Sequence, residues 1–521
     1  MVRKPASRRW VLLAAGVGLW ATPVAPAQLR VATWNISNYA GGRDADIKAA
    51  VYTVFEGRSM SPDIILCQEF SNASSAAVTA FKNILNSAPG SPADWQAAPW
   101  VYGPDTVSAF FYRTSKVNYL GYTIVLSGGN DPIPPRNVMR YDVRLVGYSS
   151  TPAVLCCYDT HMKAGTTPAD RARRLVEAQA IRANAESFDP QRNFLLGGDF
   201  NIRAATETAY EELVGSQANN QGRFFDPINT PGSWYQNSYL KFTHTQDPSL
   251  SPGMDDRYDQ ILVSGNLIDG NGLDYIGDPA VPYSTTTWND ANHSYRAWGN
   301  DGTCYGQLLT VTGNTMVGAA IAQAIRNVAT TAGGHIPVLL DLRVPAVLGA
   351  DPNTINFGSV PQNGVAQQAL SVWNNGNVAR WSAAGIDTLH YSLTATPGFS
   401  APPGTFDDDA GGGSNAHIIA MDTSTPGSRS GTLTITSNAP DAPERTIMLL
   451  GEVTAPAWAK GDLNCDGWVD FVDINPFVLA ITSYDAYHAD YPDCEWLNGD
   501  CNDDGYVDFS DISPFVVLLQ G

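Results

Sequence analysis

Residues 28–346 alternate short apolar runs with segments whose apolar positions recur at helical spacing. The apolar runs have the length of buried strands, and Pro168 followed by Asp170 is typical of a helix start. We expect strands at Leu29–Ile36, Ile64–Gln68, Ala109–Arg113, Met139–Val146, Val154–Thr160, Phe194–Gly198, Gln260–Ser264 and Val338–Leu342, and helices at Ala45–Phe55, Ala73–Leu85, Pro168–Ser187 and Met316–Thr330. This alternation predicts an α/β domain.

Residues 347–456 have a different pattern. They contain many Gly, Pro, Ser and Thr, short alternating strands such as Ala369–Trp373 and Gly431–Thr436, and no helix signals. The stretches 353–358 and 372–376 resemble bacterial immunoglobulin-like sandwich repeats. We therefore expect an all-β spacer domain here.

Residues 457–521 contain an internal repeat, because the stretch 461–473 recurs at 499–511. In both copies side-chain oxygens stand at loop positions one, three, five, nine and twelve, with Gly at six, which is the spacing of a calcium loop. The predicted ligands of two Ca²⁺ ions are Asp462, Asn464, Asp466, Asp470 and Asp473, and Asp500, Asn502, Asp504, Asp508 and Asp511. The apolar runs Phe477–Ile481 and Phe515–Leu519 are expected to be helices. The alternative is a merely acidic tail.

The repeat resembles a dockerin, a small all-α calcium-binding module that binds cohesin on a partner. The resemblance implies a cohesin-like or cell-surface protein as partner. Position twelve is Asp rather than Glu, and Phe471, Val472, Phe509 and Ser510 occupy the positions that usually carry partner recognition. Cys465, Cys494 and Cys501 are candidates to staple this module, with the pairing left open.

Residues 1–27 have the pattern of a secretory signal. Four basic residues precede the apolar stretch Trp10–Ala21, and Ala25-Pro26-Ala27 is a cleavage site. The apolar stretch is too short for a membrane anchor, and no later segment is long enough to span a bilayer. We therefore expect a secreted or surface-associated protein. In the domain boundaries that we predict, this signal is followed by domains at 28–346, 347–456 and 457–521.

Charge and cysteine content narrow the picture further. The net charge is −20, and residues 28–343 hold 23 basic and 29 acidic side chains. This balance lacks the basic footprint of most nucleic-acid binders, which counts modestly against a duplex DNA substrate. Export permits disulfides among the seven cysteines, although Cys67 and the pair Cys156-Cys157 are expected to pack in the core.

Polar residues stand at the ends of the expected strands. The run 195–203 leaves a buried strand through Gly197-Gly198 and delivers Asp199 and Asn201, which point the same way in extended chain. Other strands end in Asn35, Glu69 and His161, and two more begin at Asp259 and beside His335.

In this order the six segments resemble the endonuclease/exonuclease/phosphatase superfamily, over residues 28–343. The resemblance implies a four-layer α/β sandwich, in which two mixed β-sheets are flanked by helices and the polar strand ends meet on one edge. It also implies hydrolysis of phosphate esters with a divalent cation.

The residue types suggest a division of roles. Glu69 with Asn35 suits Mg²⁺ or Mn²⁺. Asp259 orients His335 as the base, while Asp199 and Asn201 position water for in-line attack. His161 donates to a phosphate oxygen or protonates the leaving oxygen. Lys163, Arg136 and Arg140 are the candidates for phosphate contacts.

Two positions depart from the family pattern. Gly334 stands where family members usually have Asp, and neighbouring Asp255 and Asp256 cannot be assumed to replace it. Asp105 is only a possible stand-in for the Glu that nucleases of this family place behind the equivalent of His161.

The expected function is that of a secreted metal-dependent phosphodiesterase, foremost an endonuclease. A phosphomonoesterase or a sphingomyelinase-like lipid hydrolase uses the same chemistry and stays open. A surface-anchored binding protein with an impaired site is the alternative of another class.

Overall fold

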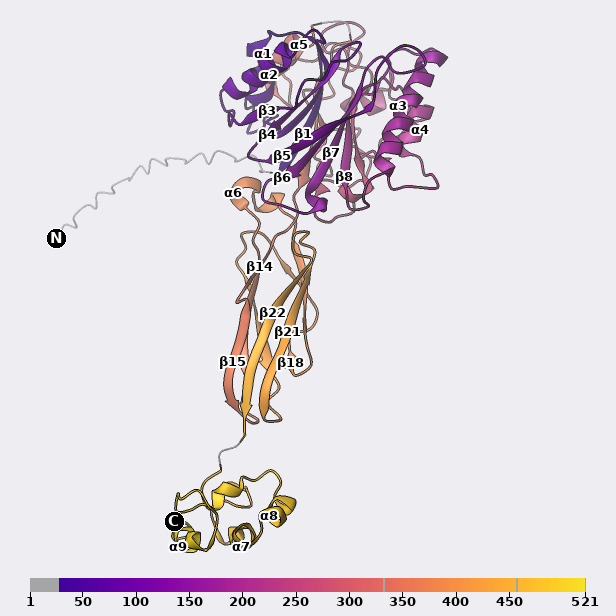
Figure 1. Cartoon of the computed structure of the whole chain (residues 1–521). Helices are drawn as coiled ribbons and strands as arrows, with labels where there is room; N and C mark the ends of the chain where they lie inside the picture. The colour runs from indigo at the N-terminus through magenta and orange to yellow at the C-terminus, as the bar shows by residue number, and fades with distance from the viewer. Residues whose placement is uncertain (1–27, 331–332, 456–457, 521) are drawn as a thin grey trace, which may run out of the picture.

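The computed structural model describes residues 28–330, 333–455 and 458–520, which form three successive parts of the chain (Figure 1). The predicted signal sequence lies outside the described residues, so export stays a prediction. Within the described ranges, no helix combines the length and apolar character needed to cross a membrane.

The first part contains two mixed sheets. The first has seven strands in the order β11-β13-β1-β2-β4-β3, with β12 also paired to β13. Only β1 and β2 are parallel neighbours in it. Its strands are β1 (Leu29–Tyr39), β2 (Ile64–Phe70), β3 (Trp95–Ala97), β4 (Val107–Arg113), β11 (Asp274–Tyr275), β12 (Arg296–Ala297) and β13 (Val338–Arg343).

The second sheet has six strands in the order β5-β6-β7-β8-β10-β9, and β7 and β8 are its parallel pair. Its strands are β5 (Val117–Leu126), β6 (Val138–Leu145), β7 (Val154–His161), β8 (Asn193–Asp199), β9 (Phe224–Phe225) and β10 (Asp259–Ser264). The sequence analysis missed the edge strand β5.

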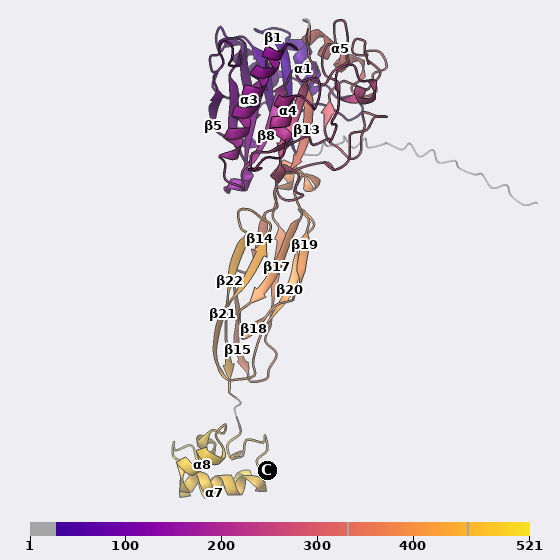
Figure 2. The ribbon, with the colours of Figure 1, turned by 90° about the vertical axis from the view of Figure 1, so that its right-hand side faces the viewer.

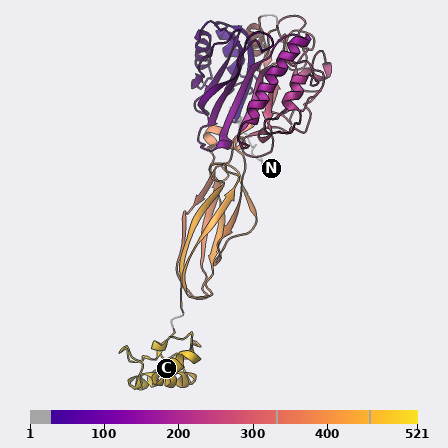
Figure 3. The ribbon, with the colours of Figure 1, turned by 45° about the vertical axis from the view of Figure 1, so that its right-hand side comes forward.

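Helices cover the outer face of each sheet. The helices are α1 (Asp44–Tyr52), α2 (Ala76–Ser87), α3 (Pro168–Glu186), α4 (Thr208–Val214) and α5 (Gly318–Val328). α1, α2 and α5 pack on the first sheet, and α3 and α4 lie over the second (Figures 2 and 3). One apolar core lies between each sheet and its helices. A third apolar core fills the space between the two sheets, with Leu66, Tyr141, Leu195 and Leu340 among its members. The predicted sandwich of two mixed sheets between helices is confirmed.

Strand direction brings the polar strand ends together. β1 and β2 run parallel, as do β7 and β8, so the carboxyl ends within each pair lie at the same edge of their sheet. In the second sheet Asp199 is aligned with His161 on one side and with Asp259 on the other. The strand register therefore fixes three of the predicted site residues side by side.

The second part is a β-sandwich of a four-stranded sheet, β14-β16-β20-β18, and a five-stranded sheet, β15-β22-β21-β17-β19. The strands are β14 (Leu348–Asp351), β15 (Thr354–Pro361), β16 (Gln367–Asn374), β17 (Leu389–Ala395), β18 (Phe399–Ser400), β19 (Thr405–Asp408), β20 (Asn415–Met421), β21 (Gly427–Ser437) and β22 (Glu444–Thr454). The expectation of no helix was wrong in one place: α6 (Val378–Trp381) begins at Asn377, whose side chain accepts from the Arg380 N–H.

The β-sandwich and the first part share a core. Trp381, Ile386 and Ala410 belong to the apolar cluster between the two sheets of the first part. The Lys116 Nζ donates to the Arg380 carbonyl at 2.6 Å and lies 4.4 Å from the ring centroid of Trp381. The two parts are thus joined by buried apolar contacts as well as by the chain.

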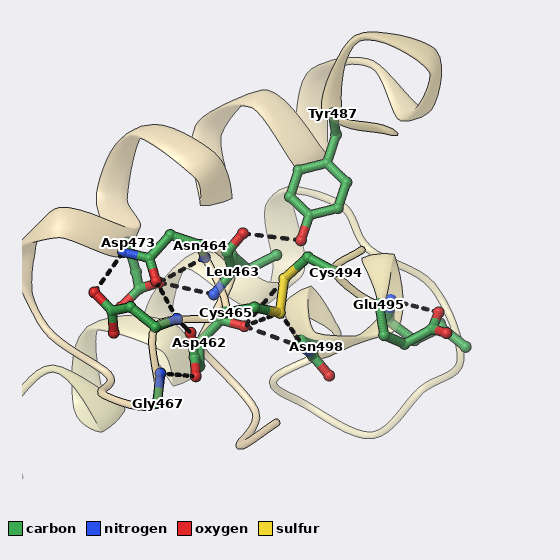
Figure 4. Close-up of a disulfide and its surroundings, with 12 residues drawn as sticks. Asp462, Leu463, Asn464, Cys465, Gly467, Asp473, Tyr487, Cys494, Glu495 and Asn498 are labelled. Atoms are coloured by element: carbon green, nitrogen blue, oxygen red, sulfur yellow. Dashed lines mark hydrogen bonds between the residues drawn. A yellow bond between two sulfur atoms is a disulfide. The ribbon is translucent and has the colours of Figure 1, made fainter. Parts of the chain in front are cut away.

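The third part contains the helices α7 (Ile474–Thr482), α8 (Tyr484–Asp490) and α9 (Ile512–Leu518), and no strand among its described residues. Its small core stacks Phe477 on Phe515, with ring centroids 4.0 Å apart. A disulfide joins Cys465 to Cys494 (Figure 4). Cys501 keeps a free thiol.

Candidate active site

Asp199 is the centre of the polar cluster. Its Oδ2 atom accepts a hydrogen bond from Asn35 Nδ2 at 3.1 Å. The same oxygen lies 3.3 Å from His161 Nε2 and 3.4 Å from His335 Nε2. The Asn35 amide also donates to Glu69 Oε1 at 3.0 Å. Residues from both sheets therefore converge on one carboxylate.

Two site residues have a backbone conformation that non-glycine residues rarely adopt. φ is 62° at Glu69 and 53° at Asn201. At Glu69 the pairing of β2 with β4 shifts its register, and the turned carboxylate accepts from the Asn38 N–H at 2.8 Å. Such backbone strain persists only where the surroundings impose it, and it is common at functional sites. The Asn201 N–H donates to Asp199 Oδ1 at 3.0 Å, and its amide donates to the Met162 carbonyl at 3.2 Å.

His161 is buried with Nδ1 lacking a hydrogen-bond partner among the described residues. The nearest carboxylate oxygen to that atom is Glu69 Oε1 at 3.9 Å. Burial holds the pKa of His161 well below its usual value, and the charges of Arg136 and His335 lower it further. A neutral His161 can donate a hydrogen bond to a phosphate oxygen, but it holds no spare proton for a leaving group.

His335 and Asp259 form a buried pair. The His335 Nδ1 atom lies 2.7 Å from Asp259 Oδ2. Burial disfavours the imidazolium, yet the charges of Asp259 and Asp199 outweigh it and raise the pKa of His335. Burial likewise raises the pKa of Asp199. The neighbouring carboxylates therefore favour the protonated form of His335.

The residues predicted to contact phosphate, Arg136, Lys163 and Arg140, lie in different surroundings. Arg136 lies beside the site, since its Nη1 approaches the His161 carbonyl at 3.5 Å and its Nη2 pairs with Asp105 at 3.0 Å. Asp105 thus binds Arg136 and not the imidazole of His161. The Lys163 Nζ pairs with Asp170 at 2.9 Å, at the start of α3, and no contact with the cluster is found among the described residues.

Arg140 does not belong to the site. Its guanidinium pairs with Asp142 at 2.9 Å and donates to Asn184 near the end of α3 at 2.8 Å. It also lies 4.9 Å from the ring centroid of Phe188. The Arg140 side chain points to the helix-covered face, at the end of α3 remote from the cluster, so the structure does not bring it together with the other predicted site residues.

Gly334 is enclosed. A Cβ atom at this position would lie 2.8 Å from the Cβ and the carbonyl oxygen of Ala329. An Asp side chain at this position therefore has no room unless Ala329 moves. Asp247, which the sequence analysis missed, lies next to this turn: its carboxylate accepts from the Gly333 N–H at 3.0 Å, and its own N–H donates to the Gly334 carbonyl at 2.8 Å.

Asp255 and Asp256 are buried beside the cluster, and each has an Oδ1 atom without a hydrogen-bond partner among the described residues. Burial raises the pKa of Asp256 well above its usual value. Two further buried acids lie behind His161. Asp159 accepts from Gln68 Nε2 at 2.8 Å, and Glu177 accepts from the Lys163 N–H at 3.1 Å. Asp159 and Glu177 were not singled out by the sequence because burial alone distinguishes them.

The first predicted calcium loop is closed by backbone hydrogen bonds (Figure 4). The Asp462 carboxylate accepts from the N–H groups of Asp466 at 3.2 Å and of Gly467 at 3.0 Å. The Asp473 carboxylate accepts from Asn464 N–H at 3.0 Å. Gly467 has a φ of 94°, which fits the sharp turn expected at position six.

The second loop repeats these contacts. Asp500 accepts from the N–H groups of Asp504 and Gly505, and Asp511 accepts from Asn502. Of the remaining predicted ligands, Asp470 and Asp508 accept from backbone N–H groups two residues on. In the described ranges, however, no group of three or more His, Cys, Asp or Glu side chains is arranged to hold a metal ion, so metal binding stays a proposal.

Comparisons with known proteins add little beyond this geometry. No protein-family model matches the chain, and no curated protein matches it. Solved structures do match. A humanized TDP2 from D. rerio has 12% identity and a TM-score of 0.35, with 61% of this chain and 100% of that chain covered.

Two other matches are similar in kind. The catalytic domain of human Nocturnin has 16% identity and a TM-score of 0.32, with 61% of this chain and 95% of that chain covered. An endonuclease/exonuclease/phosphatase from Beutenbergia cavernae has 13% identity and a TM-score of 0.30, with 81% and 100% covered.

Proposed function

We propose that the protein is a secreted, metal-dependent phosphodiesterase that acts as an endonuclease on nucleic acid. The observation that carries this proposal is the meeting of Asn35, Glu69, His161 and His335 around Asp199. Burying two imidazoles and two carboxylates together is costly, and such clusters with perturbed pKa values gather at functional sites.

The residues divide the reaction between them. His335, oriented by Asp259, takes the proton of the attacking water. Asp199 and Asn201 hold that water in line with the phosphorus atom. Water attacks as the P–O bond to the leaving oxygen breaks, and that oxygen takes its proton from solvent. Neutral His161 donates a hydrogen bond to a non-bridging phosphate oxygen. Arg136, already paired with Asp105, reaches the phosphate only if it leaves that partner.

Glu69 and Asn35 are the residues that we propose for Mg²⁺ or Mn²⁺. Mg²⁺ in enzymes is bound through one or two carboxylates and keeps several waters, so one strained, half-buried Glu beside an amide fits it. The ion would supply positive charge that neutralises the carboxylates and the phosphate. With less negative charge nearby, the pKa of His335 would fall toward the range in which it can act as a base.

The other parts of the chain serve attachment in this proposal. The β-sandwich, with its immunoglobulin-like sequence, is a spacer. The tail is a dockerin-like EF-hand module with two Ca²⁺ ions. Phe471, Val472 and Phe509 are 77%, 64% and 71% exposed, which suits contact with a cohesin-like or cell-surface partner.

Two observations favour an alternative function. The first part has more acidic than basic residues, and Gly334 replaces a family carboxylate. Both favour a small substrate, hydrolysed by a phosphomonoesterase or a sphingomyelinase-like lipid phosphodiesterase, or a catalytically impaired binding protein.

A substrate panel tests the proposal. Residues 28–455 are incubated with single-stranded DNA, duplex DNA, RNA, sphingomyelin vesicles and small phosphomonoesters, with Mg²⁺ and with a chelator. We expect acid-soluble nucleotides that appear only with Mg²⁺. Release of inorganic phosphate from monoesters would favour a phosphomonoesterase, and release of phosphocholine from vesicles a lipid phosphodiesterase. No hydrolysis of any substrate would favour a binding protein.

A further inference from the structure

Arg203 lies in the loop after β8, four residues after Asp199, and its guanidinium is held in place from two sides. Its Nε donates to the Tyr258 hydroxyl at 2.7 Å, and its Cζ lies 3.9 Å from the ring centroid of Tyr235. The backbone is fixed as well, because the Arg203 carbonyl accepts from the Trp234 N–H at 2.8 Å and from the Tyr235 N–H at 3.3 Å.

The two Nη groups of Arg203 are left over. Among the described residues neither forms a hydrogen bond or an ion pair, and neither is a buried polar atom, so both face solvent. Arg136 and Arg257 differ, since they pair with Asp105 at 3.0 Å and with Asp226 at 2.8 Å. A guanidinium that is fixed but unpaired is prepared to bind an anion with little loss of side-chain freedom.

Arg203 is close to the reacting groups without contacting them. Tyr258 immediately precedes Asp259, and its carbonyl accepts from the N–H of Phe200 at 2.9 Å. Four residues of extended chain reach at most about 14 Å, which bounds the distance between the Cα atoms of Arg203 and Asp199. Among the described residues the Arg203 side chain contacts Tyr258 and Tyr235 rather than Asp199 or His335, so an anion bound there is distinct from a phosphate at those two residues.

We propose that Arg203, held by Tyr235 and Tyr258, binds the phosphate next to the one that is cleaved. The ligand is a strand with successive phosphodiesters, so the inference rests on the proposed endonuclease function and narrows its substrate. A lipid head group or a small monoester has no second backbone phosphate. Base stacking on Tyr235 is less favoured, because Arg203 already covers one face of that ring.

This assignment also accounts for the charge balance. The first part lacks the broad excess of Lys and Arg that tracks a long duplex. A fixed guanidinium beside the catalytic cluster is enough to hold a short stretch of strand, since a charge-assisted bidentate contact is among the strongest of single hydrogen-bonded contacts.

The test compares substrates with one and with several phosphates, using the full chain with Mg²⁺. The substrates are the dinucleotide TpT, with one phosphodiester, and the tetranucleotide TpTpTpT, with three. We expect Arg203→Ala to lower kcat/KM for the tetranucleotide about 10- to 100-fold more than for the dinucleotide. Arg203→Lys should restore part of the difference, because it keeps the charge and loses the fork.

Arg223 provides a matched control. Its Nε donates to the Val214 carbonyl at 2.6 Å, and its Cζ lies 4.8 Å from the Phe225 ring centroid, at the end of β10 opposite Asp259. Arg223→Ala removes the same charge and a similar stacking contact, and it should not change the ratio of the two kcat/KM values. An equal loss on both substrates in Arg203→Ala, or no loss, overturns the inference.

A binding measurement separates this inference from the proposed function. The affinity for a labelled oligothymidylate is followed by anisotropy in chelator, as a function of salt. Neutralising one phosphate fewer should reduce the slope of log K against log salt by about 0.7 in Arg203→Ala. If the wild-type protein cleaves nothing but this slope changes, the endonuclease fails and Arg203 still binds phosphate. An unchanged slope refutes the role of Arg203 whatever the activity.

Discussion

The His335 Nδ1 atom lies 2.7 Å from Asp259 Oδ2, and both side chains are almost completely buried. Because of this contact, a substitution in the pair can lower stability as well as activity. Removing the imidazole would leave a buried carboxylate without its partner, which costs about 3–5 kcal/mol. His335→Ala therefore confounds lost chemistry with lost stability.

Asp259→Asn is the cleaner variant. It keeps the size of the side chain and removes the charge that orients and supports the base, so kcat should fall at least about 100-fold. Activity and the melting temperature of residues 28–455 are measured together. A folded variant with near-normal turnover would exclude the His335–Asp259 pair from the reaction.

Glu69→Gln tests the proposed metal residue. The amide keeps the shape and the acceptor for the Asn38 N–H but lacks the charge that attracts a hard cation. We expect the Mg²⁺ concentration for half-maximal activity to rise about tenfold or more. Titration calorimetry with Mg²⁺ provides the direct measurement, and equal affinities in both proteins would move the metal elsewhere.

Gly334→Asp should not repair the site. The new Cβ would lie 2.8 Å from Ala329, and such overpacking costs about 1–3 kcal/mol. We expect a lower melting temperature and lower turnover, and Gly334→Ala should show the same drop in stability. Faster turnover with tighter Mg²⁺ binding in the Asp variant would mean that the site had simply lost a ligand.

Glu177 should make stability depend on pH. Burial raises its pKa to about 8, against which the Lys163 N–H and the charge of Arg136 act only in part. Between the usual carboxyl range and pH 8 the folded state keeps a proton that the unfolded chain releases, so stability falls as pH rises, by at most about 1.4 kcal/mol per unit. Melting temperatures of the wild type and Glu177→Gln at pH 5 and pH 8 check this. Parallel trends in both proteins would contradict it.

The tail should depend on calcium. Residues 461–521 hold thirteen acids and no Lys or Arg, and their core is small. With Cys465–Cys494 reduced, chelation should abolish the helical circular dichroism of the isolated tail, and Ca²⁺ should restore it. Hydrolysis by residues 28–455 should continue with Mg²⁺ when Ca²⁺ is absent. A reduced tail that stays folded in excess chelator argues against calcium loops.

The sequence was informative where strand ends carry polar residues. Asn35, Glu69, His161, Asp199 and His335 could be grouped in advance, because apolar runs locate strands and strand polarity gathers their ends. Arg140 was grouped with the site from its position in the sequence. That position does not reveal that its side chain lies on the face of β6 that α3 covers.

Other features depend on contacts between distant segments. Asp247 lies in a loop, and only the fold brings it beside Gly334. Arg203 follows Asp199 by four residues, but its contacts with Tyr235 and Tyr258 come from other segments. The edge strand β5 was missed because it buries little, with Leu120, Tyr122 and Ile124 exposed. The enclosure of Gly334 by Ala329 is a matter of packing that no motif records.

The core of the first part is completed by Trp381, Ile386 and Ala410, which follow it in the chain. The sequence pattern changes near residue 346, but the hydrophobic core does not end there. A gene fragment that stopped there would expose the side chains these three cover. A different tail can be joined after β22 without disturbing this shared core. A chain with a different second domain would have to repack the side chains that Trp381, Ile386 and Ala410 now cover.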